Sequence, residues 1–303
     1  MTPQMRLSPK AWGMILILAL IWAGSFLANR AALESIGVYT TVAFRVTGGA
    51  IVLWIWIYAS GAKVPRQARY VPIFLMHGLL NNALPFTLIV WGQQFIDSGL
   101  ASILNATTAL FTVLLVPIAF ADERLTLNRL VGVLIGFAGV VVVIGFDAFR
   151  NLNLSALGQW AILGASLSYA LSAIISRRTL RGLQPEIASA GMLTGAGLIM
   201  IPLALWTDGM PDFAYSGRSI VAVLYLAIMA SAVAYRLYYI VLTTAGAGNL
   251  SLVTLLIIPF AICLGAVVYG ETLDWHAYVG FMVLTLGLVV LDGRLPIGKT
   301  PKP

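Results

Sequence analysis

The sequence repeats itself at one constant spacing, and this repeat constrains the fold more than any other feature. Identical residues recur 148 positions apart, as from Glu123 to Glu271, along most of the chain. The recurring pairs are Trp12 and Trp160, Arg30 and Arg178, Gly49 and Gly197, Ile51 and Ile199, Leu104 and Leu252, Glu123 and Glu271, Leu125 and Leu273, Gly132 and Gly280, and Gly139 and Gly287. An internal repeat of this kind indicates two equal halves. We therefore predict one unit over residues 1–148 and a second over residues 149–303, together forming one domain.

Composition places both halves in a membrane. Of the 303 residues, 60% are hydrophobic and 10% are charged, whereas a soluble domain carries about 25% charged residues. The apolar runs are continuous and about 20 residues long, the length that a helix needs to cross the hydrocarbon core, so we predict an all-α integral membrane protein. The first run is expected to remain as an uncleaved span. Spans are predicted over residues 10–30, 38–59, 70–95, 99–120, 128–146, 156–177, 184–206, 217–241, 249–269 and 275–292.

Basic residues predict how these spans are oriented. With the N-terminus in the cytoplasm, the cytoplasmic loops and tails hold thirteen Lys and Arg residues and the opposite side holds three. This bias follows the positive-inside rule and places both termini in the cytoplasm. Because each half holds an odd number of spans, the second half must enter the membrane in the opposite orientation. The sequence therefore predicts ten transmembrane helices in two inverted five-helix repeats, an arrangement typical of secondary transporters.

Four short motifs resemble those of a known family. They are Trp22-Ala-Gly24-Ser25-Phe26 in the first span, Phe44-Arg45 in the second, Tyr169-Ala-Leu-Ser172 in the sixth, and Pro259 followed by Glu271, Gly280 and Gly287 across the ninth and tenth. With these motifs in register over nearly the whole chain, the sequence resembles the EamA-type drug/metabolite transporter (DMT) superfamily, and within it the bacterial YddG-type aromatic amino-acid exporters. The resemblance implies the ten-span DMT/EamA fold and transport of small molecules. The position equivalent to Pro259 in the first half is Phe111, so the two halves need not bend alike.

Polar and aromatic side chains within the spans indicate where a solute could bind, since polar groups are costly in lipid unless they face a cavity or a partner. On the third span, His77, Asn81, Pro85 and Trp91 recur near helical spacing and could line one wet face. The candidate substrate-binding residues are Trp22, His77, Asn81, Trp91, Asn105, Tyr169, Tyr235 and Tyr239. Two alternatives stay open: each aromatic side chain could face lipid or the membrane interface, and His77 could be a hydrogen-bonded structural residue.

Proline and glycine suggest where helices bend and where they pack. Pro85 and Pro259 each remove a backbone hydrogen bond close to a polar segment, so both are candidate gating hinges. Small residues around Gly139 in the fifth span and Gly287 in the tenth are expected to bring these helices together within the chain. A dimer seam is the alternative for the same two faces.

Charged residues within the spans are few. Arg45 and Arg236 lie roughly five to six residues from a span end, so both are expected to snorkel to the interface. The alternative is that one of them binds a substrate carboxylate. All eleven Asp and Glu residues fall in loops or at span ends, which disfavours exchange of protons for cationic drugs.

No metal-binding cluster, nucleotide loop or catalytic motif is recognisable, so we expect no enzyme activity, no metal and no cofactor. We predict an inner-membrane exporter of amino acids, aromatic and other neutral ones, and of related small metabolites, working by alternating access. Its expected partners are the small-molecule substrate and the lipid bilayer, and no nucleic acid is expected to bind. The chain is expected to act as a monomer, and a dimer is the open alternative. The alternative functions are a multidrug or metabolite exporter with other substrates, and a membrane lipid enzyme or structural subunit.

Overall fold

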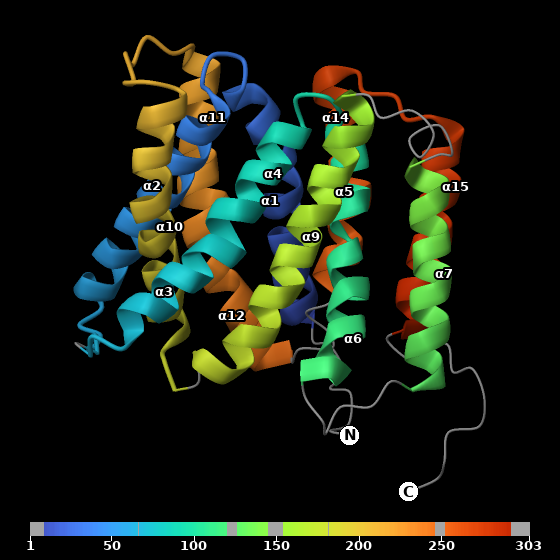
Figure 1. Cartoon of the computed structure of the whole chain (residues 1–303), viewed down its shortest axis with the longest axis horizontal. Helices are drawn as coiled ribbons and strands as arrows, with labels where there is room; N and C mark the ends of the chain where they lie inside the picture. The colour runs from blue at the N-terminus through green and yellow to red at the C-terminus, as the bar shows by residue number, and fades with distance from the viewer. Residues whose placement is uncertain are drawn as a thin grey trace, which may run out of the picture.

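The computed structural model describes residues 9–65, 67–119, 126–144, 154–180, 182–245 and 252–291. Over these ranges the chain is helical, without strands (Figure 1). In chain order the elements are α1 (Pro9–Ala32), α2 (Val38–Ala59), α3 (Tyr70–Gly78), η1 (Leu79–Ala83), α4 (Leu84–Gly92), α5 (Ser98–Asn105), α6 (Thr107–Ala119), α7 (Leu127–Ile144), α9 (Leu154–Thr179), α10 (Pro185–Thr207), α11 (Gly217–Ala227), η2 (Ile228–Val233), α12 (Ala234–Ala245), α14 (Leu252–Tyr269) and α15 (Trp275–Leu291). The elements η1 and η2 are π-helical turns.

Seven helical segments in the described part of the chain are long and apolar enough to cross a membrane. They are Pro9–Ala32, Val38–Ala59, Tyr70–Gly92, Ser98–Ala119, Ser155–Ser176, Pro185–Thr207 and Gly217–Val241, and they fall in predicted spans one to four and six to eight. Shorter apolar helices, Leu127–Val143, Leu256–Tyr269 and Trp275–Val290, fall in the other three. Large apolar side chains such as Trp206, which is 85% exposed, face outward, as expected where lipid takes the place of water. The predicted turn at Glu123 and both termini lie outside the described residues.

Helices α7 and α15 stand side by side at one end of the long axis of the molecule (Figure 1). A Cβ at Gly139 would lie 2.4 Å from the backbone nitrogen of Leu284, and a Cβ at Gly287 would lie 2.4 Å from that of Gly136. Residue numbers rise along α7 where they fall along α15, so these helices are antiparallel. Lipid gives no hydrophobic drive to bring helices together, and close backbone contact takes its place. The small-residue faces of α7 and α15 therefore pack against each other within the chain.

The other helices form the body of the bundle. Helix α10 packs on α2 and α3, helix α1 packs on α11 and α14, and helix α9 packs on α4, α5 and α6. Helices α1 and α9 lie in the middle of the molecule (Figure 1). Side chains from these two central helices therefore reach segments of both halves of the sequence.

Each π-helical turn lies against a hydrogen-bond donor from one of the central helices. Ser168 Oγ on α9 donates to the carbonyl of Leu80 in η1 at 2.7 Å. Trp22 Nε1 on α1 donates to the carbonyl of Ala230 in η2 at 3.3 Å. A π-turn interrupts the regular α-helical hydrogen bonds, and in lipid an unpaired backbone carbonyl is costly. The donors from α9 and α1 compensate for the irregular backbone at these two places.

The contact at Gly139 can be tested with a matched pair of substitutions. Gly139→Ala places a methyl group against the α15 backbone, so it should lower the free energy of unfolding by about 1–3 kcal/mol, despite the better helix propensity of alanine. Gly13→Ala is the control, because nothing lies within 4 Å of a Cβ at that position. Thermal unfolding in detergent compares the two variants, and equal melting temperatures would contradict the close contact.

Candidate functional site

A cavity of about 590 Å³ lies in the body of the bundle, with walls from both halves of the sequence. Its aromatic and polar lining residues include Trp22, Asn29, Arg45, Asn81, Phe86, Asn105, Tyr169, Tyr235, Tyr238 and Tyr239. The lining continues through Ser176 on α9 to Leu183 and Pro185 at the start of α10. The cavity therefore extends from the middle of the bundle towards the connection between α9 and α10.

Aromatic rings form much of the cavity wall. Trp22 and Tyr238 have ring centroids 5.8 Å apart and tilted by 45°, and Tyr238 meets Tyr239 edge to face at 5.2 Å. Phe86 and Tyr169 also meet edge to face, at 6.4 Å. Rings fixed against one another in this way present flat apolar surfaces with polar hydroxyl tips. Such a wall suits a small molecule with an apolar or aromatic body.

Tyr235 joins the cavity wall to η1. Its hydroxyl donates to Asn82 Oδ1 at 2.9 Å and accepts from Asn81 Nδ2 at 3.3 Å. Asn82 is fully buried, whereas Asn81 lines the cavity. The π-turn and the tyrosine therefore position one asparagine side chain in the cavity wall and hold the other in the core.

Asn105 enters the wall where the fourth predicted span is interrupted at Ala106, between α5 and α6. Thr107 Oγ1 donates to the carbonyl of Leu104 at 2.7 Å, and Ser166 Oγ from α9 lies 3.3 Å from the carbonyls of Leu104 and Asn105. These hydroxyls satisfy backbone groups at the interruption, as lipid requires. The side-chain oxygen of Asn105 is buried without a hydrogen-bond partner among the described residues.

Arg45 is buried, which the sequence did not indicate. Its side chain is only 6% exposed and lines the cavity, so the prediction that it snorkels to the interface is wrong. Nε donates to Ser231 Oγ at 3.4 Å, and the guanidinium lies 3.7 Å from the ring centre of Phe86. Helix α2 packs against α10, α11 and η2, which turns this face inward. Distance from the span end gives no information on that rotation. Arg236, by contrast, is exposed and lies over the Trp56 ring.

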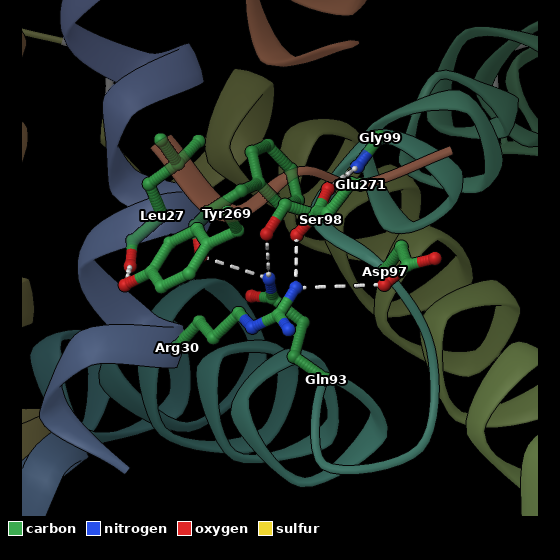
Figure 2. Close-up of polar contacts among 9 residues, drawn as sticks. Leu27, Arg30, Gln93, Asp97, Ser98, Gly99, Tyr269 and Glu271 are labelled. Carbon is green, nitrogen blue, oxygen red and sulfur yellow. Dashed lines mark hydrogen bonds and ion pairs between the residues drawn. The ribbon is translucent and has the colours of Figure 1, made fainter. Parts of the chain in front are cut away.

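An ion cluster joins three segments at the other end of the bundle (Figure 2). Arg30 at the end of α1 contacts the Glu271 carboxylate at 2.5 Å and that of Asp97 at 3.5 Å. The Glu271 side chain is 3% exposed and also accepts from the backbone N–H of Gly99 at 3.3 Å. A buried carboxylate needs such charge-assisted partners. This ion cluster of Arg30, Asp97 and Glu271 therefore ties α1, the start of α5 and the α14–α15 connection together.

The electrostatics of the ion cluster affect Asp97. Partial burial raises the pKa of Asp97 above its ordinary value of 3.8, and the neighbouring Glu271 charge raises it further, whereas Arg30 lowers it. A raised pKa means that the packed arrangement holds the proton more tightly than free aspartate does. Asp97 therefore favours the packed arrangement most at a pH below 3.8, and this contribution is lost as the pH rises through the raised pKa.

A second, polar cavity of about 430 Å³ lies beside the ion cluster and is lined by Arg30, Gln93 and Asp97. Gln93 is buried, donates to the carbonyl of Phe26 at 2.9 Å, and accepts from Asn29 Nδ2 at 2.9 Å. Asn29 lines the first cavity and Gln93 lines the second. At this point one side-chain hydrogen bond spans the partition between the two cavities.

Both halves of the sequence match the same protein family. The EamA-like transporter family matches the chain twice, over residues 10–145 and over residues 156–291. The chain belongs to the EamA-like transporter family. The resemblance to the DMT superfamily drawn from the sequence motifs is confirmed. Membership makes the protein a small-molecule transporter with membrane-spanning helices and speaks against an enzyme.

Several relatives match this EamA-like chain over nearly its full length. It is 25% identical to the "Probable terminal-alkyne amino-acid exporter" of Streptantibioticus cattleyicolor, over 96% of this chain and 95% of that protein. It is 24% identical to "Protein PagO" of Salmonella typhimurium, over 94% of each. It is 25% identical to the "Uncharacterized inner membrane transporter YedA" of Escherichia coli, over 94% of this chain and 92% of that one. A solved crystal structure covers 93% of this chain with a TM-score of 0.68 at 19% identity, which shows a shared fold.

Six of the eight candidate binding residues line the central cavity of this EamA-like transporter: Trp22, Asn81, Asn105, Tyr169, Tyr235 and Tyr239. His77 and Trp91 are not among its described lining residues. His77 is buried among hydroxyls, with Nε2 at 2.7 Å from Thr179 and Nδ1 at 3.3 Å from Ser172. Trp91 packs edge to face on Phe95.

The predicted single wet face of the third span is therefore not observed. Its spacing assumed a uniform α-helix, and the π-turn of η1 changes the helical register between His77 and Trp91. Pro85 follows η1 at the start of α4, and Pro259 lies inside α14. Neither proline is among the described lining residues, and their hinge roles stay predictions.

The role of the Tyr235 hydroxyl can be tested directly. Tyr235→Phe would leave Asn82 Oδ1 buried without a donor, and should lower the free energy of unfolding by about 1–3 kcal/mol. Tyr238→Phe is the matched control, because the described residues offer its hydroxyl no hydrogen bond and both tyrosines line the cavity. Thermal unfolding in detergent measures both variants. A similar loss in the two would contradict the positioning role of Tyr235.

Proposed function

We propose that this protein is an inner-membrane exporter of neutral amino acids, aromatic ones included, and that it works by alternating access. The observation that carries the proposal is the central cavity, which combines an aromatic wall with asparagines and one buried arginine. An amino acid presents the same combination of apolar body and polar groups. The relative from Streptantibioticus cattleyicolor, named as a probable amino-acid exporter, supports this substrate class, and the YedA relative supports the inner membrane.

We further propose ten membrane spans in two inverted five-helix repeats, over residues 1–148 and 149–303. The double match to the family and the antiparallel pair α7 and α15 support this arrangement. The two π-turns support it as well, because η1 meets a donor from the sixth span and η2 meets one from the first. Inverted repeats place the substrate site where the halves meet, which is where the cavity lies.

The two ends of the cavity suggest which state of the cycle the structure represents. The end at Leu183 and Pro185 belongs to a connection that the basic residues assign to the cytoplasm. The opposite end is closed by the ion cluster and by the bond between Asn29 and Gln93. The arrangement therefore fits a transporter that is closed to the outside and accepts solute from the cytoplasm.

Counterflow in proteoliposomes tests the substrate class. Vesicles preloaded with unlabelled phenylalanine should take up labelled phenylalanine, whereas vesicles loaded with buffer should not. Trp22→Ala removes part of the aromatic wall and should raise the half-saturation concentration about tenfold or more. Trp91→Ala, the same substitution outside the described lining, should change it less than about threefold. Absence of exchange with every neutral amino acid, in folded wild-type protein, would overturn the proposed substrate class.

Cysteine labelling tests the proposed outer closure. A Ser25→Cys probe in the cavity wall, with Cys263→Ser removing the single native cysteine, should react slowly with an impermeant maleimide added outside. Glu271→Gln removes the buried anion that holds Arg30, a loss of about 1–2 kcal/mol because Arg30 is partly exposed, and should raise the labelling rate roughly 5- to 30-fold.

Asp97→Asn is the matched control for this experiment, because Asp97 is more exposed and lies at the longer distance from Arg30. It should change the rate less than about threefold. Unchanged labelling in Glu271→Gln would show that the ion cluster does not hold the closure.

A further inference from the structure

We propose that Arg45 binds the carboxylate of the transported molecule, so that the cavity selects solutes with one carboxylate beside an apolar or aromatic body. This inference rests on the proposed function, whose site it refines. It starts from a buried cation. Arg45 is the one charged side chain among the described residues that line the cavity, and it is 94% buried, since its exposure is 6%.

The described part of the chain gives Arg45 no counter-ion. The ion pairs found there join Arg30 to Asp97 and Glu271, and Arg218 to Glu34. A charged group within a membrane protein is costly unless it is paired or faces water or a cavity. Arg45 faces a cavity whose described lining contains no Asp or Glu. An anion that enters the cavity would therefore meet an attractive charge and no acidic competitor.

The contacts of Arg45 leave the part of its guanidinium that recognises carboxylates available. Ser231 Oγ accepts from Nε at 3.4 Å, and the Phe86 ring covers one face at 3.7 Å. The two terminal nitrogens make no hydrogen bond with the described residues. A guanidinium has five N–H donors in a planar fork, and two parallel donors match the two oxygens of a carboxylate. Phe86 and Ser231 also fix the plane of the fork before a ligand arrives.

Two asparagines of the cavity lining carry amide oxygens that have no partner among the described residues. Asn105 Oδ1 and Asn29 Oδ1 are buried without partners among the described residues, and both side chains line the cavity. Amide oxygens accept hydrogen bonds from an ammonium group. A wall with one cation and neutral acceptors suits a zwitterion better than an organic cation, which would be repelled by Arg45 without a carboxylate to offset the charge.

Matched ligands and variants test the inference. Counterflow of labelled phenylalanine is measured with phenylalanine, phenylalaninamide and 3-phenylpropionate as competitors, for the wild type, Arg45→Gln, Arg45→Lys and Arg236→Gln. Wild type should prefer phenylalanine to its amide. Arg45→Gln should raise the half-saturation concentration for phenylalanine about 10- to 100-fold and lose this preference. Arg45→Lys should retain part of it, and the exposed Arg236→Gln control should stay within about threefold of wild type.

The outcomes separate this inference from the proposed function. If wild type exchanges phenylalanine and Arg45→Gln keeps both its half-saturation concentration and its preference over the amide, the role of Arg45 is overturned and the amino-acid exporter stands. If wild type exchanges no amino acid, the proposed function fails, and thermal shifts with 3-phenylpropionate against its amide decide the role of Arg45. If 3-phenylpropionate stabilises the wild type and Arg236→Gln but not Arg45→Gln, the role of Arg45 is supported. If 3-phenylpropionate does not stabilise the wild type, the role of Arg45 is overturned. Should Arg45→Gln fail to fold, Arg45→Lys is judged by the same preference.

Discussion

The rest of this structure depends on one requirement: in lipid, every backbone polar group must find its partner within the protein. In the described ranges, the predicted spans depart from a regular α-helix at three interior places, η1, η2 and Ala106. Each is met by a side chain of a central helix, namely Ser168 at η1, Trp22 at η2 and Ser166 beside Ala106. These irregular places also border the cavity, through Asn81, Ala230 and Asn105. Part of the polar wall of the cavity therefore comes from irregular backbone that side chains of α1 and α9 compensate.

The closely packed pair of helices α7 and α15 is distinct from the part of the chain that contains the central cavity. Helices α7 and α15 meet through glycines with almost no space for a Cβ, and neither contributes a described lining residue to the central cavity. Small residues of this kind fix two helices at short distance, because dispersion forces act only over contact distances. The described chain therefore divides into a closely packed helix pair at one end and a body that contains the central cavity.

The helices and much of the cavity could be predicted from the sequence, and the features that could not have physical causes. Continuous apolar runs are read directly from composition, so the helix ranges lie near the predicted spans. Trp22, Asn81, Asn105 and three tyrosines could be placed in one cavity because polar groups in lipid must face inward. The π-turn of η1 could not be predicted from the sequence, because its carbonyl partner Ser168 is distant along the chain. As a result of this turn, His77 and Trp91 do not share the face that regular helical spacing predicts. Arg45 and the partners of Glu271 were missed for a similar reason: both depend on how helices rotate and meet.

Arg30 and Arg45 show how one side-chain type can have opposite surroundings in the same protein. Arg30 has its anions built in, at 2.5 Å and 3.5 Å, and they come from segments that must separate if this end opens. Arg45 has a hydroxyl and an aromatic ring instead. These neutral contacts stabilise the empty site only partly, so the substrate carboxylate that we propose would gain by binding there. When the proposed carboxylate leaves, Arg45 keeps its contacts with Ser231 and Phe86. The guanidinium is therefore never left wholly without partners. A built-in carboxylate at Arg45 would occupy the fork permanently, whereas a transporter needs a partner that can leave.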